Sequence, residues 1–334
     1  MVHLVSILIP AYNAEKWIGE TIQSALNQTW PRKEIVIVDD GSRDNTLRIA
    51  RAFESASVKV ITQENRGASA ARNKALTFAQ GDFIQWLDAD DLLAPDKISQ
   101  QLRYVDESQR NARVLLSSAF GEFCYRMQKA EFKPNSLWRD LAPVDWILIK
   151  FAENLWVNPA SWLVSREVTN LAGPWDERLS LDDDGEYFCR IVASSEKIEF
   201  INEAKSFYRR SSLDSLSRAN SYKACESLLL SLELSIGYLR SLEDSERTRT
   251  ASLKLLQTWF HYFYPEKHEL VKKMNDLACE LEGILVPPDL NWKYSIIKTI
   301  FGWEAAKKVR DMARKAKMAA YINWDKLMFK ISRS

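Results

Sequence analysis

The order of apolar runs and helical patterns in the first hundred residues is the feature that most constrains the fold. Strand-like runs occur at residues 4–10, 34–38, 58–62 and 82–87. Segments with helical spacing of apolar residues separate them, at 14–28, after residue 44 and at 67–79. Because each helix returns the chain beside the preceding strand, this order predicts a parallel sheet covered by helices on both faces. The nearly continuous apolar character of the strands agrees with burial on both sides.

The pattern changes after about residue 110. Short strands are expected at 114–118, 161–165 and 198–208. From about residue 220 the chain has a helical pattern to its end, interrupted at Pro287-Pro288. We therefore expect an α/β domain over 1–218, with halves 1–110 and 111–218, and a mostly helical region over 219–334.

Composition excludes several classes of protein. The formal net charge of the 334 residues is +1, which gives no overall field for binding nucleic acid. No run of about 20 apolar residues is present, as a membrane-spanning helix would need, and the N-terminal pattern is that of a first strand rather than a leader peptide. The four cysteines lack paired or metal-binding spacing, so we expect a reducing, cytoplasmic setting.

Two groups of carboxylates follow two strands of the expected sheet. Asp39 and Asp40 come directly after 34–38, and the sequence "DADD", which carries Asp88, Asp90 and Asp91, follows 82–87. Parallel strands end at one edge of a sheet, where ligands bind, so both groups should meet there. Their mutual repulsion favours a hard divalent cation, Mn²⁺ or Mg²⁺, among them. Taken singly, each group also fits a structural turn or helix cap.

Longer motifs carry a resemblance to a known family. The stretches are "VSILIPAYNAEKWIGETIQSALNQTWPRKEIVIVDDGSRDNT", "NRGASAARNKAL", "GDFIQWLDADD" and "GPWDERLSLDDDGEYFCRIV". In this order they resemble the family 2 glycosyltransferases, which are inverting enzymes with the GT-A fold. The resemblance implies a Rossmann-like, mostly parallel mixed sheet flanked by helices. It makes 1–110 the nucleotide-sugar-binding half, 111–218 the acceptor-binding half and 219–334 a helical appendage.

The resemblance also implies roles for residues of the donor half. Those expected to bind the nucleotide-sugar are Pro10, Ala11, Tyr12, Asp40, Arg72 and Asp88. Asp88 and Asp90 are the expected ligands of Mn²⁺ or Mg²⁺, with Asp90 the firmer of the two, while Asp91 is expected to support the loop. For Tyr12 the alternative is packing at the end of a strand, and for Arg72 it is a plain surface arginine.

The acidic run "LDDDGEYFCR" matches the catalytic motif of the family at Asp183 and Asp184. The match implies that Asp184 is the general base, with Asp183 where relatives carry glutamate. A solvated acidic loop is the alternative, and Asp182 competes if the register slips by one residue. The histidine that many relatives carry soon after "YR" is replaced by Ser211 and Ser212. The neighbouring Arg209 and Arg210 then fit either phosphate contacts or a surface pair.

The activity implied is inverting transfer of a sugar from a nucleoside-diphosphate sugar, UDP-linked above all, to a hydroxyl of a glycan or lipid-linked glycan. Such an activity serves polysaccharide biosynthesis, and the tryptophan-rich stretch 138–175 is the expected acceptor pocket. A nucleotidyltransferase would need a glycine-rich phosphate loop after the first strand, and "PAYNAEKW" offers none. A glycan-binding module without activity is the other alternative.

The C-terminal stretch is basic and amphipathic. Residues 290–334 hold 11 Lys or Arg and 3 Asp or Glu, and apolar residues recur on one face over 303–324. This pattern fits a helix lying on an anionic membrane, which would place the chain at the inner face of the cell membrane. A helix docked on the domain with a solvated basic face is the alternative, and the pattern favours it slightly. Nucleic acid is not an expected partner.

Overall fold

The computed structural model describes residues 2–103, 105, 113–210, 221–288 and 295–331. Its first sheet has the strand order β3-β2-β1-β4-β8. The strands are β1 (Val5–Ala11), β2 (Lys33–Asp39), β3 (Val58–Thr62), β4 (Phe83–Trp86) and β8 (Val164–Ser165). All neighbours are parallel except β8, which runs antiparallel to β4. The parallel sheet expected from the sequence is confirmed.

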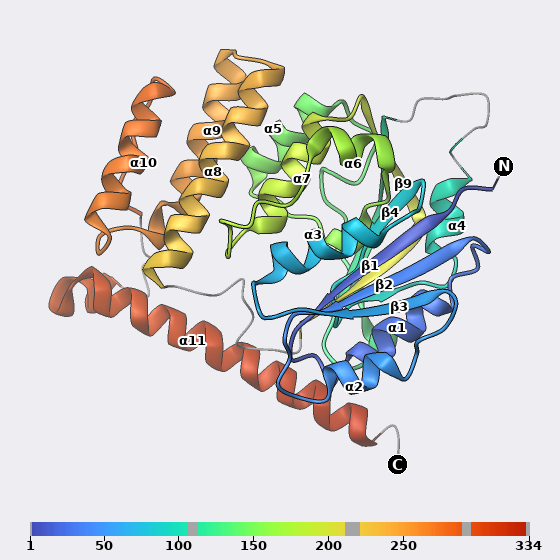
Figure 1. Ribbon diagram of the computed structural model, residues 1–334. Coiled ribbons are helices and arrows are strands. Elements are labelled where there is room, and N and C mark those ends of the chain that lie inside the picture. Colours follow the sequence, from blue (N-terminus) through green and yellow to red (C-terminus); the bar gives the residue numbers. More distant parts are fainter. Residues whose placement is uncertain (1, 104, 106–112, 211–220, 289–294, 332–334) are drawn as a thin grey trace.

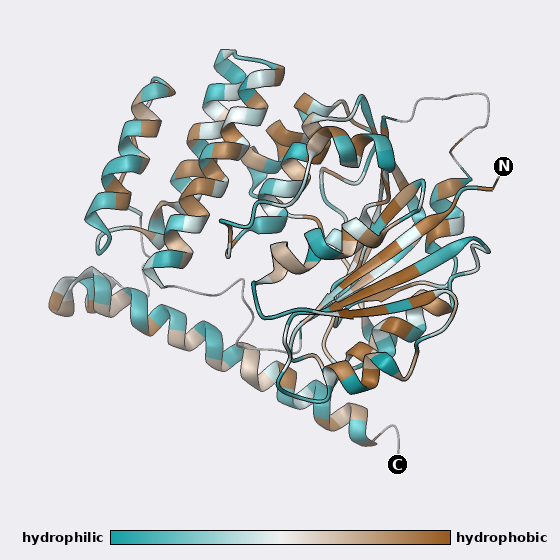
Figure 2. Ribbon diagram, in the orientation of Figure 1, coloured by the Kyte–Doolittle hydropathy of each residue, from teal (hydrophilic) through white to brown (hydrophobic). Residues whose placement is uncertain are grey.

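Helices cover both faces of this sheet, which explains its continuous apolar strands (Figures 1 and 2). The covering helices are α1 (Ile18–Leu26), α2 (Thr46–Arg51) and α3 (Ala68–Phe78). Alternate residues of each strand point to opposite faces. Leu8 and Val36 therefore join the core under α3, whereas Ile7 and Ile35 join the core under α1 and α2.

A second sheet, of order β5-β9-β6-β7, continues the fold. Its strands are β5 (Leu92–Leu93), β6 (Val114–Phe123), β7 (Glu131–Phe132) and β9 (Lys197–Arg209). The expected strands at 114–118 and 198–208 are confirmed and longer. That at 161–165 is wrong in extent, because Pro159–Ser161 forms a 3-10 turn and only Val164–Ser165 pairs as a strand.

The remaining helices lie beside and after this sheet. They are α4 (Lys97–Leu102), α5 (Pro143–Glu153), α6 (Arg166–Ala172), α7 (Asp183–Ala193), α8 (Tyr222–Leu242), α9 (Glu246–Trp259), α10 (His268–Glu280) and α11 (Ser295–Ile331). One apolar cluster runs from Leu8 through Phe188 of α7 to Leu228 of α8 and Leu256 of α9. The expected boundary at residue 218 falls outside the described residues and stays a prediction. Among the described helices, none combines the length and the apolar character needed to cross a membrane.

Candidate active site

The two aspartates at the end of β2 hold two different loops. Asp39 is buried, and its Oδ2 accepts a hydrogen bond from the Ser42 backbone N–H at 3.2 Å, which closes the turn after β2. Asp40 accepts from the backbone N–H groups of Arg66 at 2.9 Å and Gly67 at 2.8 Å. Asp40 thereby ties the end of β2 to the segment directly before α3, near the helix end that favours negative charge. Both carboxylates lie at the carboxyl edge of the sheet.

Arg72 of α3 joins two of the acidic segments. Its Nη1 donates to Asp183 Oδ2 at 2.7 Å and its Nη2 to Asp88 Oδ1 at 2.9 Å. The side chain is 7% exposed, and the guanidinium lies 4.3 Å from the centre of the Trp175 ring. Burial would lower the pKa of Arg72, but Asp183 and Asp88 outweigh it and raise that pKa. The alternative of a surface arginine is wrong, and residues after β4 and at the start of α7 meet here.

The acidic run at the start of α7 sends its three carboxylates in different directions. Asp182 has a left-handed backbone (φ 60°) and accepts a hydrogen bond from Ser231 Oγ of α8 at 2.6 Å. Asp183 pairs with Arg72, as described above. Asp184 lines a small cavity of about 40 Å³ together with Trp156. The alternative of a solvated loop is wrong, because Asp184 belongs to a helix and is half-buried.

The environment of Asp184 raises its pKa to about 7. Burial is the largest cause, the charges of Asp183 and Asp182 add to it, and Arg72 opposes them. Near neutral pH this carboxyl group therefore exchanges a proton readily, which suits a general base. Asp182 also has a raised pKa through burial, but the Ser231 hydroxyl already occupies its carboxylate.

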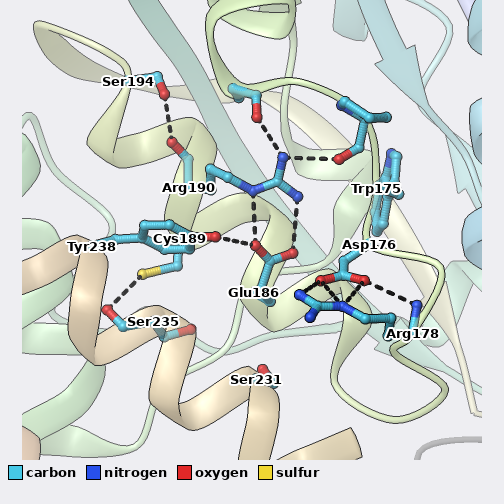
Figure 3. Close-up of polar contacts among 12 residues, drawn as sticks. Trp175, Asp176, Arg178, Glu186, Cys189, Arg190, Ser194, Ser231, Ser235 and Tyr238 are labelled. Atoms are coloured by element: carbon cyan, nitrogen blue, oxygen red, sulfur yellow. Dashed lines mark hydrogen bonds and ion pairs between the residues drawn. The ribbon is translucent and has the colours of Figure 1, made fainter.

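A network behind α7 fixes the helix in place (Figure 3). The Glu186 carboxylate accepts from Arg190 Nε at 2.8 Å and from the Tyr238 hydroxyl of α8 at 2.7 Å. Arg190 Nη1 donates in turn to the Pro174 carbonyl at 2.8 Å. These residues border a shallow surface hollow of about 390 Å³. The network ties α7 to α8 and to the segment before α7, so it sets the direction of Asp183 and Asp184.

The "DADD" loop is held from beneath by β9. Asp91 is buried and accepts from the Arg209 backbone N–H at 2.9 Å and from Asn158 Nδ2 at 2.7 Å, so it supports the loop as expected. Burial is the main cause that raises the pKa of Asp90 to about 6, with Asp88 adding to it and Arg209 opposing it. Asp90 is thus a carboxylate whose negative charge is only partly balanced by the protein.

Arg209 supports the same loop and is buried rather than part of a surface pair. Its Nε donates to the Asp90 carbonyl at 2.7 Å, and its Nη2 donates to Glu20 at 2.7 Å. The guanidinium lies 4.1 Å from the centre of the Trp17 ring. Arg210 pairs instead with Glu122 at 2.6 Å. Ser211 and Ser212, which replace the histidine of relatives, lie outside the described residues.

The donor set fits a cation that the protein holds only in part. Among the described residues, no three His, Cys, Asp or Glu side chains are grouped as ligands of one ion. Asp88 and Asp90 can supply carboxylate oxygens, and Mg²⁺ and Mn²⁺ sites of this kind take further oxygens from phosphate and water. Tyr208 of β9 was missed by sequence reasoning. Burial is the largest cause that raises the pKa of its phenol, and the charges of Asp91, Asp90 and Asp184 add to it.

Comparison with known proteins shows which family the chain belongs to. Residues 6–150 match the model of Glycosyl transferase family 2. The chain is 30% identical over 225 residues to glycosyltransferase GlyG of Streptococcus pneumoniae serotype 4, which covers 64% of this chain and 72% of GlyG. The chain belongs to glycosyl transferase family 2. The family resemblance and the class of glycosyltransferases are thereby confirmed.

Other members of glycosyl transferase family 2 match the donor half more closely but over less of their length. The chain is 43% identical over 107 residues to the putative teichuronic acid biosynthesis glycosyltransferase TuaG of Bacillus subtilis, covering 31% of this chain and 42% of TuaG. It is 43% identical over 101 residues to the UDP-Glc:alpha-D-GlcNAc-diphosphoundecaprenol beta-1,3-glucosyltransferase WfgD of Escherichia coli, covering 30% of this chain and 40% of WfgD. The matches to TuaG and WfgD thus span less than half of each relative's length.

A solved structure confirms the expected GT-A fold. S. aureus TarS 1-349 in complex with UDP-GlcNAc superposes with a TM-score of 0.66 at 19% identity, covering 83% of this chain and 81% of TarS 1-349. At this identity the likeness shows the fold alone. The helical region after α7 is part of the comparison, because the superposition extends beyond the first two hundred residues.

Proposed function

We propose that this chain is an inverting, metal-assisted glycosyltransferase that uses a UDP-sugar. The observation that carries the proposal is the meeting of Asp88 and Asp183 on the two arms of Arg72, with the half-buried Asp184 following Asp183 at the start of α7. Carboxylates from the carboxyl edge of the sheet and from the start of α7 thereby flank one space. Support for UDP comes from WfgD, whose name gives UDP-Glc as its donor, and from TarS, solved with UDP-GlcNAc.

The donor would bind across the carboxyl edge of the sheet. Tyr12 follows β1 and is 46% exposed, so its ring is free to stack on the base, beside Pro10 and Ala11. Asp40 lies next to Ala11, since its backbone N–H donates to the Ala11 carbonyl at 2.8 Å, and its carboxylate would accept from the base or ribose. Arg72 and Asp88 would face the ribose and diphosphate.

The transfer step needs neutralisation at the leaving group and a base at the acceptor. A divalent cation, when bound at Asp88 and Asp90, supplies positive charge where the departing diphosphate becomes negative. Asp184 would remove the proton of the attacking hydroxyl from the opposite side of the sugar, so a single displacement inverts the anomeric carbon. Asp183 would hold Arg72 in place, and Arg72 would keep the pKa of Asp184 from rising further.

The acceptor would enter beside Asp184. The cavity that Asp184 lines is also bordered by Lys150 of α5 and Trp156, and Trp156 is 41% exposed. Trp146 and Trp162 are buried and line the inner side of the same cavity, whereas Trp175 is buried in the core away from it. The exposed face of the Trp156 ring, with Lys150 and Asp184 beside it, would offer a sugar ring an apolar surface next to polar groups. We infer a glycan or lipid-linked glycan as acceptor, used in polysaccharide biosynthesis at the inner face of the cell membrane.

Release of UDP from a panel of UDP-sugars, with Mn²⁺ and a mixture of acceptor glycans, tests the proposal. Asp184→Asn should abolish turnover while UDP still binds in calorimetry, and Asp90→Asn should weaken both turnover and the dependence on Mn²⁺. Asp276→Asn, an exposed aspartate of α10, is the matched control and should act like the wild type. If no donor is cleaved, the proposal is withdrawn. If Asp184→Asn leaves the measured function intact, a glycan-binding module is favoured.

A further inference from the structure

The C-terminal part of helix α11, from Met318 on, packs on the rest of the protein through one face. Ile322 and Asp325 are buried, and Met318 and Phe329 are half-buried. These four residues recur at intervals of three or four, so they form one line along the helix. Asp325 anchors this face, because its Oδ2 accepts from the Tyr125 backbone N–H at 2.8 Å and its Oδ1 from Arg126 Nε at 2.7 Å. The expected docking of the C-terminal helix is therefore present.

The opposite face of α11 is apolar and exposed. Its large side chains have exposed fractions of 41, 70, 59, 49 and 58% at Val309, Met312, Trp324, Leu327 and Ile331. Exposed Ala313, Ala316 and Ala320 continue the same line between Met312 and Trp324. We call these eight residues the apolar stripe. Figure 1 shows α11 extending along one side of the molecule, and Figure 2 shows apolar and polar residues alternating along it.

The apolar stripe is flanked by positive charge. The exposed basic residues of this helix near it are Lys308, Arg314, Lys315, Lys317, Lys326 and Lys330. Between 309 and 331 the acidic residues are Asp311, which is half-buried, and Asp325, which is buried on the docked face. An exposed apolar line of this length marks an interaction surface. An apolar stripe flanked by lysines and arginines fits a partner that is both apolar and negatively charged.

We propose that α11 binds the surface of an anionic lipid bilayer through the apolar stripe. The apolar side chains would enter the boundary between headgroups and acyl chains, and the flanking lysines would meet the lipid phosphates. A second copy of this chain fits the stripe less well, because a two-fold contact would bring the same lysines face to face. The surface extends the one expected over 303–324, since it continues on the same face to Ile331.

The docked face connects this surface to the candidate active site. Tyr125, which Asp325 holds, packs its ring 5.3 Å from that of Trp17, and the Arg209 guanidinium lies over Trp17. Arg209 in turn donates to the carbonyl of Asp90. A bilayer bound to α11 would therefore lie a few side chains from the candidate active site, so a lipid-linked acceptor in that bilayer would be close to the site. This last step rests on the proposed function, but membrane binding itself does not.

Flotation of the full chain with lipid vesicles tests the proposal. Vesicles of phosphatidylcholine alone are compared with vesicles that also contain phosphatidylglycerol. We expect binding to the anionic vesicles, weakened at least tenfold by Trp324→Glu or Leu327→Glu. Lys326→Glu with Lys330→Glu should remove the preference for phosphatidylglycerol. Leu171→Glu is the matched control, because Leu171 of α6 is 57% exposed and lies outside the apolar stripe.

Sedimentation velocity and UDP release without vesicles separate the possible failures. Variants that keep the wild-type thermal unfolding and UDP release but lose vesicle binding support the proposal. The proposal is overturned if wild-type protein ignores anionic vesicles, or if Trp324→Glu binds them unchanged. It is also overturned if the wild type is a dimer that Trp324→Glu dissociates and that does not float with vesicles. Absence of UDP release would refute the proposed function alone.

Discussion

Replacing Arg72 by methionine should both destabilise the protein and change how its activity depends on pH. Methionine fills much of the same volume but removes the charge that separates Asp88 from Asp183. The Arg72 side chain is 7% exposed, so water would compensate little for the loss of its charge. Asp88 and Asp183 would then face each other, and no positive charge would compensate their partly buried negative charges.

The size of the effect follows from this geometry. Removing one partner of a buried ion pair costs about 3–5 kcal/mol of unfolding free energy, because the remaining charge is left desolvated. Loss of the Trp175 contact adds about 1 kcal/mol. Since Arg72 lowers the pKa of Asp184, its removal should raise that pKa further above about 7. The acid limb of the activity profile should therefore move to higher pH.

Urea unfolding and a pH profile of UDP release measure the two effects. Arg66→Met is the control, because Arg66 pairs with Glu177 at 2.8 Å with side chains 64% and 42% exposed. Such exposed pairs contribute about 0–1 kcal/mol, so the control should unfold like the wild type. Arg72→Lys keeps a positive charge, so its free energy of unfolding should lie between those of the wild type and Arg72→Met. The proposed role of Arg72 between Asp88 and Asp183 is wrong if the free energy of unfolding of Arg72→Met lies within about 1 kcal/mol of the wild-type value and its pH profile is unchanged.

Three further changes test neighbouring features. Asp184→Asn should stabilise the protein by about 2–4 kcal/mol at pH 8. The pKa of Asp184 is raised from 3.8 to about 7 in the folded state, so the stability of the wild type falls as the pH rises between these values. At pH 3 the carboxyl group is protonated in both states, so thermal unfolding there should show no gain for the variant. Gly185→Ala should lower the free energy of unfolding by about 1–3 kcal/mol and abolish most of the turnover, because the new Cβ would overlap the Asp182 carboxylate. Wild-type values in calorimetry and in the UDP-release assay would contradict this. Asp325→Ala should free α11 from Tyr125 at a cost of about 1–3 kcal/mol, seen as faster proteolysis within 295–331, and unchanged cleavage would refute the anchoring role.

Much of the fold was predictable from local pattern. The strands β1 to β4 and the helices between them follow from apolar periodicity, since a strand covered on both faces must be apolar throughout. Their order also predicted that the carboxylates after β2 and β4 share an edge. The pairing confirms this, because β1 runs parallel to both β2 and β4, so the ends of β2 and β4 lie at the same edge.

The direction of individual side chains was not predictable in the same way. Three consecutive aspartates at the start of α7 look alike in the sequence, yet Asp182 accepts from Ser231 and Asp183 accepts from Arg72, while Asp184 lines a cavity that Asp182 also borders. Likewise, "YRR" does not reveal that Arg209 is buried while Arg210 pairs with Glu122. These outcomes depend on residues far apart in the chain.

The sequence by itself determined the α/β class, the parallel sheet and the edge at which acidic groups gather, because periodicity reports which faces of an element are buried. Only the tertiary structure decided which carboxylate is paired and which keeps a raised pKa, because both depend on burial and on charges from distant segments. It also decided which side of α11 is docked, since an amphipathic pattern does not say which face meets protein. The exposed apolar stripe is a consequence of that choice.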